Sequence, residues 1–377
     1  MKAYIFYKQF FNSTGETIMI GGIETYLFNL ANILKERNIE PLIIQSASLD
    51  FEKVEKGIAV RGYQLKGRNL YKKLYLKVKQ QITDDDLIIW GLDRAAVEVP
   101  NKRTISIQHG IPFDYYQEEI RIRSLLRKLG FGHTLKAIQR RMAIKAFKRA
   151  AFKVCVDYNF WNWYRTFCLP EEEKNIFVIP NFAQIDTGFC DNSVAEKDKN
   201  VLNVLFARRF VRMRGVEDFI EVAKFFKDDM RVTITFAGEG PYEKQIEDLV
   251  HGSQNIYMTK YDAGDAIEFH RGYDVAVVPS IASEGTSLSL LEAMAAGNVV
   301  ICTCVGGMTN IILDGFNGFF VKPNTPQEIV QIIEKLLLSP ALRNRMSQQA
   351  QLSVKDSFSY VLWREKWNAV INAVCNL

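Results

Sequence analysis

Two kinds of pattern alternate along the chain. Short apolar runs rich in β-branched residues predict buried parallel strands, and longer segments with apolar residues every three or four positions predict helices. In the first half of the chain the strand-like runs occupy residues 3–7, 41–45, 87–90, 103–108, 152–156 and 175–179. In the second half they occupy residues 201–207, 232–237, 274–278 and 299–304. This alternation predicts an α/β protein.

Helical spacing is clearest at residues 23–34, 288–296, 326–338 and 360–374. A Gly21-Gly22 pair precedes the first of these segments, and two glycines before a helix allow the backbone to approach a ligand closely. A polar run at residues 191–200 predicts a loop at a domain junction. A chain of 377 residues is long enough for two domains, each with its own core.

The composition is that of a globular protein, with 48% hydrophobic and 24% charged residues. No apolar run approaches the ~20 residues that a membrane span requires. The first residues lack the cleavage region of a signal peptide. Six cysteines are scattered without metal-ligand spacing, and Cys302 and Cys304 are expected to be buried thiols on one strand face. These features predict a protein of the reducing cytoplasm.

The residues with the most evident chemistry lie at positions 273–297. An apolar strand, a loop of small polar residues and a helix beginning near Leu288 follow one another there. Such a unit forms an anion site, because unpaired backbone N–H groups and the helix dipole converge at the helix N-terminus. Glu284 and Glu292 can flank the bound anion. A carboxylate beside an anion needs hydrogen-bond donors, which sugar or ribose hydroxyls supply, so the stretch predicts a sugar-nucleotide site.

Residues 284–297, E-G-T-S-L-S-L-L-E-A-M-A-A-G, resemble the Glu-x7-Glu signature of the retaining GT-B glycosyltransferases of family four. Thr286 and Ser287 replace the Phe-Gly pair that is typical of that family, and both glutamates are retained. The resemblance implies that Glu284 belongs to the catalytic centre. It also implies that the donor is bound by Gly285, Thr286, Ser287, Leu288, Ser289 and Glu292.

A basic turn follows the predicted strand at residues 201–207, with arginines at positions 208, 209, 212 and 214. Guanidinium groups fork onto phosphate oxygens, so the turn suits an oligophosphate. The resemblance assigns the family's phosphate-binding Arg and Lys to Arg209 and Arg214, and it places Arg208 where a glycine usually stands. It further implies that four glycines lie near the donor: Gly21, Gly22, Gly238 and Gly240.

His109 ends the predicted strand at residues 103–108, and parallel sheets bind their ligands at this end of a strand. The resemblance places a histidine at the equivalent position near the donor sugar and the acceptor hydroxyl. His109 is therefore expected at the reaction centre. Asp84, Asp85 and Asp86 form the Asp-x-Asp triplet of the chain, and because they precede a strand we interpret them as a polar cap and not as a metal site.

Residues 121–153 contain eleven Lys and Arg and no Asp or Glu, with apolar residues at roughly helical intervals. Since the whole chain carries a net charge of only +5, this segment holds more than the entire excess. A basic amphipathic helix is typical of a surface that binds an anionic membrane. A solvated helix face is the alternative. Nucleic acid is disfavoured because no aromatic stacking platform accompanies the basic residues.

The resemblance covers essentially the whole chain and implies a GT-B fold of two Rossmann-like doubly wound domains that face each other across a cleft. Residues 1–180 form the N-terminal acceptor-binding domain, residues 181–358 form the nucleotide-sugar-binding domain, and residues 359–377 form a helix that crosses back. The expected reaction is metal-independent transfer of a hexosyl unit, with retention, from a UDP- or GDP-linked sugar to a hydroxyl acceptor. No side chain is an evident nucleophile, which favours front-face attack.

The expected acceptor is a lipid-linked or growing glycan of a bacterial surface polysaccharide. The donor is a substrate, and no cofactor is expected. The protein is expected in the cytoplasm, peripheral on the inner face of the plasma membrane. A sugar-nucleotide epimerase on the same fold and a catalytically silent binding subunit remain open as alternatives.

Overall fold

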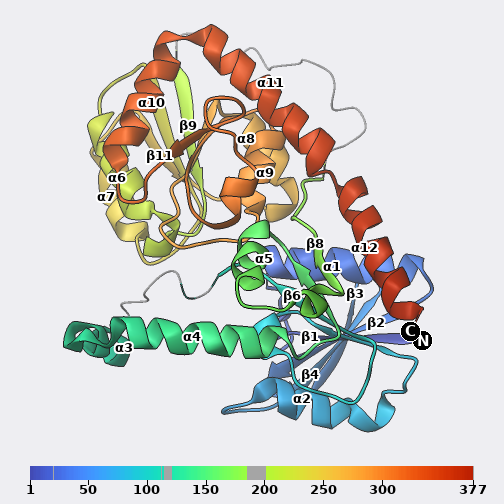
Figure 1. The fold of residues 1–377 in the computed structure, drawn as a ribbon. Coiled ribbons are helices and arrows are strands. Elements are labelled where there is room, and N and C mark those ends of the chain that lie inside the picture. Colours follow the sequence, from blue (N-terminus) through green and yellow to red (C-terminus); the bar gives the residue numbers. More distant parts are fainter. Residues whose placement is uncertain (20, 112, 114–120, 185–200, 377) are drawn as a thin grey trace. The chain divides into compact units, whose positions relative to one another are not determined.

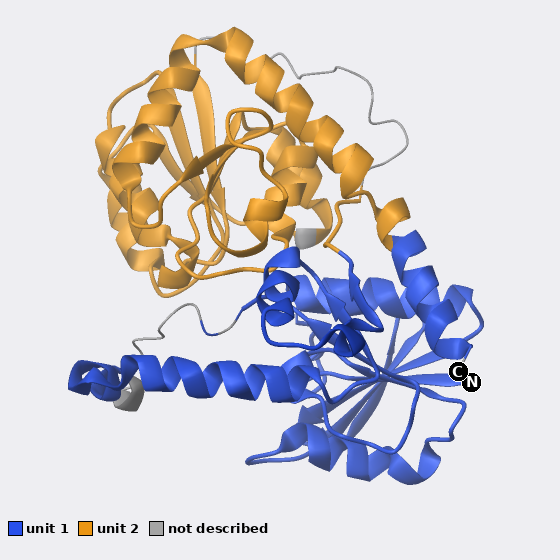
Figure 2. Cartoon of the chain, in the orientation of Figure 1, with its two compact units in different colours: residues 1–179, 364–377 blue, residues 180–363 orange. Residues whose placement is uncertain are grey.

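The computed structural model describes residues 1–19, 21–111, 113, 121–184 and 201–376. Contacts divide them into two units, residues 1–179 with 364–377 and residues 180–363 (Figure 2). The predicted boundary after residue 180 lies beside the first division, and the second division falls inside the last helix, α12 (Tyr360–Cys375). None of the helices in the described part of the chain is long and apolar enough to cross a membrane.

Unit 1 contains an eight-stranded sheet in the order β3-β4-β2-β1-β5-β6-β7-β8. Its strands are β1 (Lys2–Phe6), β2 (Glu40–Ala47), β3 (Phe51–Glu55), β4 (Ile58–Gln64), β5 (Leu87–Trp90), β6 (Thr104–Gln108), β7 (Phe152–Cys155) and β8 (Ile176–Val178). Neighbouring strands are parallel except β3 and β4, which form an antiparallel edge hairpin. The helices of this unit, besides the greater part of α12, are α1 (Gly22–Glu36), α2 (Leu70–Val78), α3 (Arg121–Leu126), α4 (Gly132–Phe147) and α5 (Tyr158–Arg165) (Figure 1).

The apolar periodicity explains how the helices of unit 1 pack. In β1, Tyr4 and Phe6 lie in one core cluster with Leu74 of α2, because alternate residues of a strand face the same side. Helix α1 buries Tyr26, Leu27, Leu30, Ile33 and Leu34, which recur at helical spacing. The predicted helix after Gly21-Gly22 is thus confirmed.

Unit 2 contains a fully parallel six-stranded sheet in the order β11-β10-β9-β12-β13-β14. Its strands are β9 (Leu202–Ala207), β10 (Val232–Ala237), β11 (Ile256–Thr259), β12 (Val275–Val278), β13 (Val299–Thr303) and β14 (Phe319–Val321). Its helices are α6 (Val216–Phe225), α7 (Glu243–His251), α8 (Ala266–Arg271), α9 (Leu288–Ala295), α10 (Pro326–Leu338) and α11 (Pro340–Ser357). This order is that of a doubly wound Rossmann-type sheet.

Both faces of the unit 2 sheet are covered, which is why its strands are apolar along their whole length. One core cluster joins Phe206 and Phe236 of the sheet to Phe219 of α6 and Ile333 of α10. A second cluster joins Val300 of the opposite face to residues of α9 and α11. Each unit is therefore an α/β layer structure, as the sequence predicts.

The prediction for Cys304 is wrong. Cys302 is buried, but Cys304 is exposed, because β13 ends at Thr303 and the shared strand face ends with it. The cysteines at positions 155, 168, 302, 304 and 375 all carry free thiols. The predicted junction loop at residues 191–200 lies outside the described residues, and so does Cys190 just before it.

Candidate functional site

The site in unit 2 is placed by the two central strands of its sheet, β9 and β12. Strands are added in opposite directions from this pair, so the sheet has its topological switch point here. Open α/β sheets bind ligands at the carboxyl ends of the strands at such a point. Arg208 directly follows β9, and the loop that contains Glu284 follows β12. Residues far apart in sequence therefore meet at one edge of the sheet.

Four of these residues form what we call the arginine–glutamate cluster: Arg208, Arg214, Ser280 and Glu284. Nη2 of Arg208 donates to both carboxylate oxygens of Glu284, at 2.7 Å each. Nη1 of Arg214 is 2.5 Å from the Glu284 Oε1. The Ser280 hydroxyl donates to the same carboxylate and accepts from Arg208. The side chains of Arg208 and Glu284 are only 5% and 12% exposed, so the pair is largely shielded from water.

The cluster keeps Glu284 ionised. Burial raises the pKa of the Glu284 carboxyl, but the charges of Arg208 and Arg214 and the hydrogen bonds from Ser280 and Arg208 outweigh burial and hold it at about 2. Two guanidinium groups then face one carboxylate, so the cluster retains one positive charge. A positive, partly buried group at a switch point is suited to bind a phosphate-bearing ligand.

Glu292, the second glutamate of the signature, lies on α9 in a different state. Burial raises its pKa to about 7, and the charge of Arg208 lowers it only in part. No hydrogen bond to its carboxylate is found among the described residues. Tyr261 is close enough for the Glu292 charge to contribute to the raised pKa of its phenol, after burial. Glu292 can therefore accept hydrogen bonds from a ligand, and it binds or releases a proton near neutral pH.

The loop between Glu284 and α9 is packed tightly. Thr286 and Ser287 are buried, and Asn181 Nδ2 donates to the carbonyl oxygen of Thr286. Ser287 is the N-cap residue of α9 but makes no capping hydrogen bond with its side chain, which instead lies 3.2 Å from the Ser289 hydroxyl. The first N–H groups of α9 thus lack a side-chain cap, which is the property of a helix N-terminus that binds an anion.

Glycines allow backbones to meet around this loop. A Cβ atom on Gly306 would lie 2.2 Å from the Glu284 carbonyl oxygen, and one on Gly307 would lie 2.6 Å from the Thr286 nitrogen. Gly307 N–H also donates to the Glu284 carbonyl oxygen at 2.7 Å. The structure shows that this Gly-Gly pair holds the Glu284 loop in place.

Gly238 and Gly240, predicted to lie near the donor, pack against the turn after β9. Their φ angles of 149° and 151° are unfavourable for residues with a side chain. A Cβ atom on Gly238 would lie 2.3 Å from the Arg208 carbonyl oxygen, and one on Gly240 would lie 2.6 Å from the Phe210 carbonyl oxygen. These glycines therefore determine how the basic turn is positioned.

The basic turn places its arginines in three different environments. Arg208 and Arg214 contact Glu284, whereas the Arg209 side chain is exposed and makes no hydrogen bond or ion pair with the described residues. Arg212 is paired with Glu217 at 3.3 Å. Arg209 and Arg214 were predicted to bind phosphate from the sequence, whereas no role was predicted for Arg208. One feature of the sequence could have indicated a role for Arg208: it is the first polar residue after the buried strand β9.

Arg208→Ala is expected to lower the thermal unfolding midpoint of the protein, because it leaves Glu284 buried with less compensating charge. Removing one partner of a buried ion pair costs about 3–5 kcal/mol, and this is an upper limit here because Arg214 and Ser280 remain. Arg231→Ala is the matched control: its partner Asp229 is 2.7 Å away in an exposed pair. Equal unfolding midpoints for the two variants would contradict the stabilising role of Arg208.

In unit 1, His109 follows β6 at the carboxyl edge of the sheet, next to the end of β5. Burial lowers the pKa of its ring to about 4, a hydrogen bond to the Gly91 backbone raises it in part, and the charge of Arg94 lowers it further. The ring is therefore neutral at pH 7, and its buried Nε2 atom has no hydrogen-bond partner among the described residues. A neutral imidazole with an unpaired ring nitrogen can accept or donate a proton.

Tyr26 contacts the His109 ring, and Trp367 in turn contacts Tyr26. Tyr26 of α1 contacts this imidazole ring edge-on, with 5.3 Å between the ring centroids. The Trp367 Nε1–H of α12 donates to the Tyr26 hydroxyl at 3.0 Å. Gly21 lies just before α1 as its N-cap residue, and Gly22 is the first helical residue. A Cβ atom on Gly21 would lie 2.4 Å from the Glu24 Oε2, so this position accepts no larger residue without movement of Glu24.

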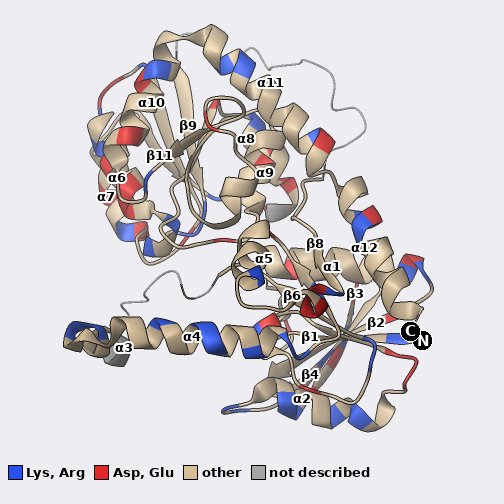
Figure 3. Ribbon diagram, in the orientation of Figure 1, with Lys and Arg blue, Asp and Glu red and all other residues tan. Residues whose placement is uncertain are grey.

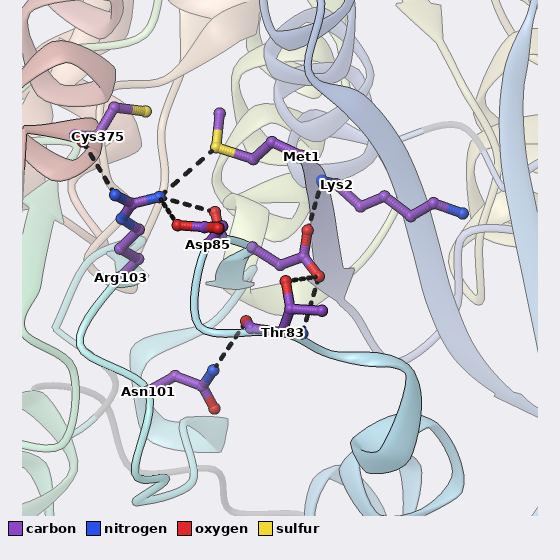
Figure 4. A network of polar contacts seen from close by, with 8 residues as sticks. Met1, Lys2, Thr83, Asp85, Asn101, Arg103 and Cys375 are labelled. Atoms are coloured by element: carbon purple, nitrogen blue, oxygen red, sulfur yellow. Dashed lines mark hydrogen bonds and ion pairs between the residues drawn. The ribbon is translucent and has the colours of Figure 1, made fainter.

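Asp85 and Asp86 of the triplet directly precede β5 at the amino end of the sheet in unit 1 and act as a cap, as predicted; Figure 4 shows the contacts of Asp85. Asp86 accepts from the Lys2 N–H at 2.7 Å and from the Thr83 N–H and hydroxyl at 2.9 Å each. Asp85 is 3.4 Å from Arg103. In the described part of the chain, no group of three or more His, Cys, Asp or Glu residues is arranged to hold a metal ion.

The amino-acid sequence of this chain is similar to a family model and to several known proteins. Residues 191–353 match the family model described as glycosyl transferases group 1. The chain is 24% identical over 314 residues to an uncharacterised glycosyltransferase of Methanocaldococcus jannaschii, which covers 82% of this chain and 78% of that protein. It is 26% identical over 185 residues to the capsular polysaccharide biosynthesis glycosyltransferase CapM of Staphylococcus aureus, which covers 46% of this chain and 48% of CapM.

Among solved structures, the HepE protein of Anabaena in complex with UDP has the same fold. The two structures match with a TM-score of 0.74 and a sequence identity of 18%, and the match covers 99% of this chain and 100% of the HepE chain. The two parallel-sheet α/β units therefore have the GT-B fold.

Proposed function

We propose that the chain is a retaining glycosyltransferase, and the match of residues 191–353 to the family model of glycosyl transferases group 1 supports this. It moves a hexosyl unit from a UDP- or GDP-linked donor to a hydroxyl acceptor. The observation that carries this proposal is the arginine–glutamate cluster beside the uncapped N-terminus of α9, at one switch point. Cations and N–H groups together suit the diphosphate of a sugar nucleotide.

The state of Glu284 bears on how the glycosidic bond forms. Its carboxylate oxygens accept from Arg208, Arg214 and Ser280, and its pKa is held at about 2. A carboxylate with so low a pKa is a weak base and a poor nucleophile. This supports transfer without a covalent glycosyl-enzyme at Glu284, by front-face attack in which the departing phosphate oxygen takes the acceptor proton. Glu284 then serves to hold the two arginines at the donor.

The acceptor we propose is a lipid-linked or growing glycan in the biosynthesis of a bacterial surface polysaccharide. The similarity to CapM, a glycosyltransferase of capsular polysaccharide biosynthesis, supports this assignment. The reaction takes place in the cytoplasm, at the inner face of the plasma membrane. HepE has been solved in complex with UDP and in complex with UDP-glucose, and this makes a UDP-linked sugar the first donor to test.

Incubation of the protein with a panel of nucleotide sugars tests the proposal. Nucleotide release that depends on an added acceptor is the expected result. Isomerised sugar formed without an acceptor would show an epimerase instead, and donor binding with no turnover of any kind would show a silent binding subunit. Thermal shift with the same panel identifies the donor before the acceptor is known.

Glu292→Ala is expected to weaken binding of the free nucleotide, because Glu292 accepts hydrogen bonds from the ribose hydroxyls. Each charge-assisted bond that is lost corresponds to about 1.5–3 kcal/mol. Binding needs the ionised carboxylate, and its pKa in the free protein is about 7. Affinity should therefore rise with pH, roughly tenfold between pH 6 and pH 8, as the ionised fraction increases.

Glu292→Gln is the matched control in the same calorimetric titration. Ionisation of the diphosphate itself changes over this range, but it affects wild type and variant equally. Only the difference in slope between the two proteins is assigned to Glu292. An identical pH dependence, or a nucleotide affinity unchanged in Glu292→Ala, would remove Glu292 from the nucleotide site.

A further inference from the structure

One segment of unit 1 has no part in the proposed site: the basic arm, which we define as α3, the π-helical turn η3 (Arg127–Phe131) and α4. Figure 1 shows that α4 leads away from the sheet of its unit and carries α3 at its far end. Gly130, in a left-handed conformation with φ of 86°, separates α3 from α4. The helical spacing predicted for this segment is confirmed, and the structure adds a break at this glycine.

The basic arm is attached at one end only. Ala143, Ala146 and Phe147, near the end of α4, are buried in unit 1. Phe147 belongs to a core cluster with Phe160 and Tyr164 of α5. Towards the start of α4 the burial ends, and five large apolar side chains of the arm are at least half exposed: Leu125 (56%), Leu129 (61%), Phe131 (52%), Ile138 (50%) and Met142 (65%).

These apolar side chains are not scattered around α4. Phe131, Leu135, Ile138 and Met142 are spaced by four, three and four residues, so they lie on one face of the helix. They form an apolar stripe in which Leu135 is partly exposed and the other three side chains are at least half exposed, while Ala143 and Phe147 on another face of the helix are buried in unit 1. An exposed stripe of this kind indicates a surface that binds another phase or molecule.

Basic residues accompany the stripe. Arg141 and Lys145 follow Ile138 and Met142 by three residues each, which places them beside the apolar side chains, and both are exposed. Arg140 is also exposed; it lies on the opposite side of the helix from the stripe, at a distance over which charges still interact at low salt. The sequence of the arm contains no acidic residue, and lysine and arginine follow one another along it in Figure 3.

From the apolar stripe and its basic border together, we infer that the basic arm docks on an anionic lipid bilayer. The stripe enters the boundary between headgroups and acyl chains, and the basic side chains contact anionic headgroups, with their alkyl stems on the apolar side. Nucleic acid matches the charge but leaves Ile138 and Met142 without a partner. This inference stands on the arm alone and does not depend on the proposed transferase activity.

Sedimentation with liposomes tests the docking surface, using phosphatidylcholine alone and phosphatidylcholine with phosphatidylglycerol. The protein should sediment with the anionic vesicles at low salt, less so at high salt, and not with phosphatidylcholine. Arg140→Gln, Arg141→Gln and Lys145→Gln combined should reduce partitioning by ~10²-fold at low salt, given the typical attraction of each basic residue to such a surface. Ile138→Ser with Met142→Ser keeps the charge and should also reduce partitioning.

The matched control is the triple variant Lys227→Gln, Lys244→Gln and Arg345→Gln, which removes the same charge from exposed positions of unit 2. It should sediment like wild type. The inference is overturned if wild type stays in the supernatant with anionic vesicles at low salt, or if the control loses as much binding as the arm variant. It is also overturned if the Ser double variant binds like wild type, or if RNA is bound through the arm and vesicles are not. Equal unfolding midpoints verify that the arm variants are folded.

Discussion

Arg214→Ala is expected to lower turnover by ~10²–10³-fold, the usual cost of removing one donor that stabilises charge in a transition state. The growing negative charge on the leaving diphosphate must be compensated by a metal ion or by preorganised cations and N–H groups. Arg214 is 2.5 Å from Glu284 and its side chain is 25% exposed, so it is held rigidly and still open to a ligand. Arg209→Ala is expected to have a comparable effect, since the exposed guanidinium of Arg209 is available to phosphate.

Arg212→Ala is the matched control for both arginine variants. Arg212 lies in the same turn, but it pairs with Glu217 and its side chain is half exposed. It should retain turnover within a few-fold of wild type. Loss of activity in Arg212→Ala equal to that in Arg214→Ala would mean that the turn is merely sensitive to substitution, and the phosphate assignment would fail.

Treatment with EDTA distinguishes the arginines from a metal ion. If the arginines compensate the leaving group, turnover should survive EDTA. The Asp84–Asp86 triplet is engaged in capping at the amino end of its sheet, the end opposite to where such sheets bind ligands. Loss of transfer in EDTA, with recovery in magnesium or manganese, would contradict the arginine assignment and require a new one for the triplet.

His109→Ala is expected to lower turnover by ~10²-fold or more and to leave nucleotide affinity nearly unchanged. The physical reason is the state of its ring, which is neutral at pH 7, packs edge-on against Tyr26, and has a buried Nε2 that forms no hydrogen bond with the described residues. Single-turnover rates and nucleotide calorimetry on the same preparation separate the two effects. A folded His109→Ala protein with wild-type turnover would make His109 a structural residue.

Trp367→Phe is a useful companion to the His109 variant. It keeps an aromatic ring next to Tyr26 but removes the N–H that donates to the Tyr26 hydroxyl. A smaller loss of turnover than in His109→Ala is expected, because the His109 ring then keeps its chemistry and loses only part of its support.

Most of the secondary structure was predictable from local pattern. The apolar runs at residues 87–90 and 232–237 coincide with β5 and β10, and the run at residues 274–278 differs from β12 by one residue, since fully buried parallel strands leave a continuous apolar signal. The edge hairpin β3–β4 was not predicted. Its first strand, Phe51–Glu55, is largely exposed, so burial leaves no clear apolar pattern in it.

The sequence alone determined the two α/β layers, the loop-and-helix unit with its two glutamates, and the basic turn after β9. Each of these depends on spacing within about twenty residues, which periodicity and motif record directly. Only the tertiary structure decided that Arg208 pairs with Glu284 across 76 positions of sequence. It likewise decided that Glu284 is held ionised while Glu292 titrates near neutrality. Two glutamates eight residues apart look alike in sequence, because a pKa depends on burial and on charges that the fold brings from other strands.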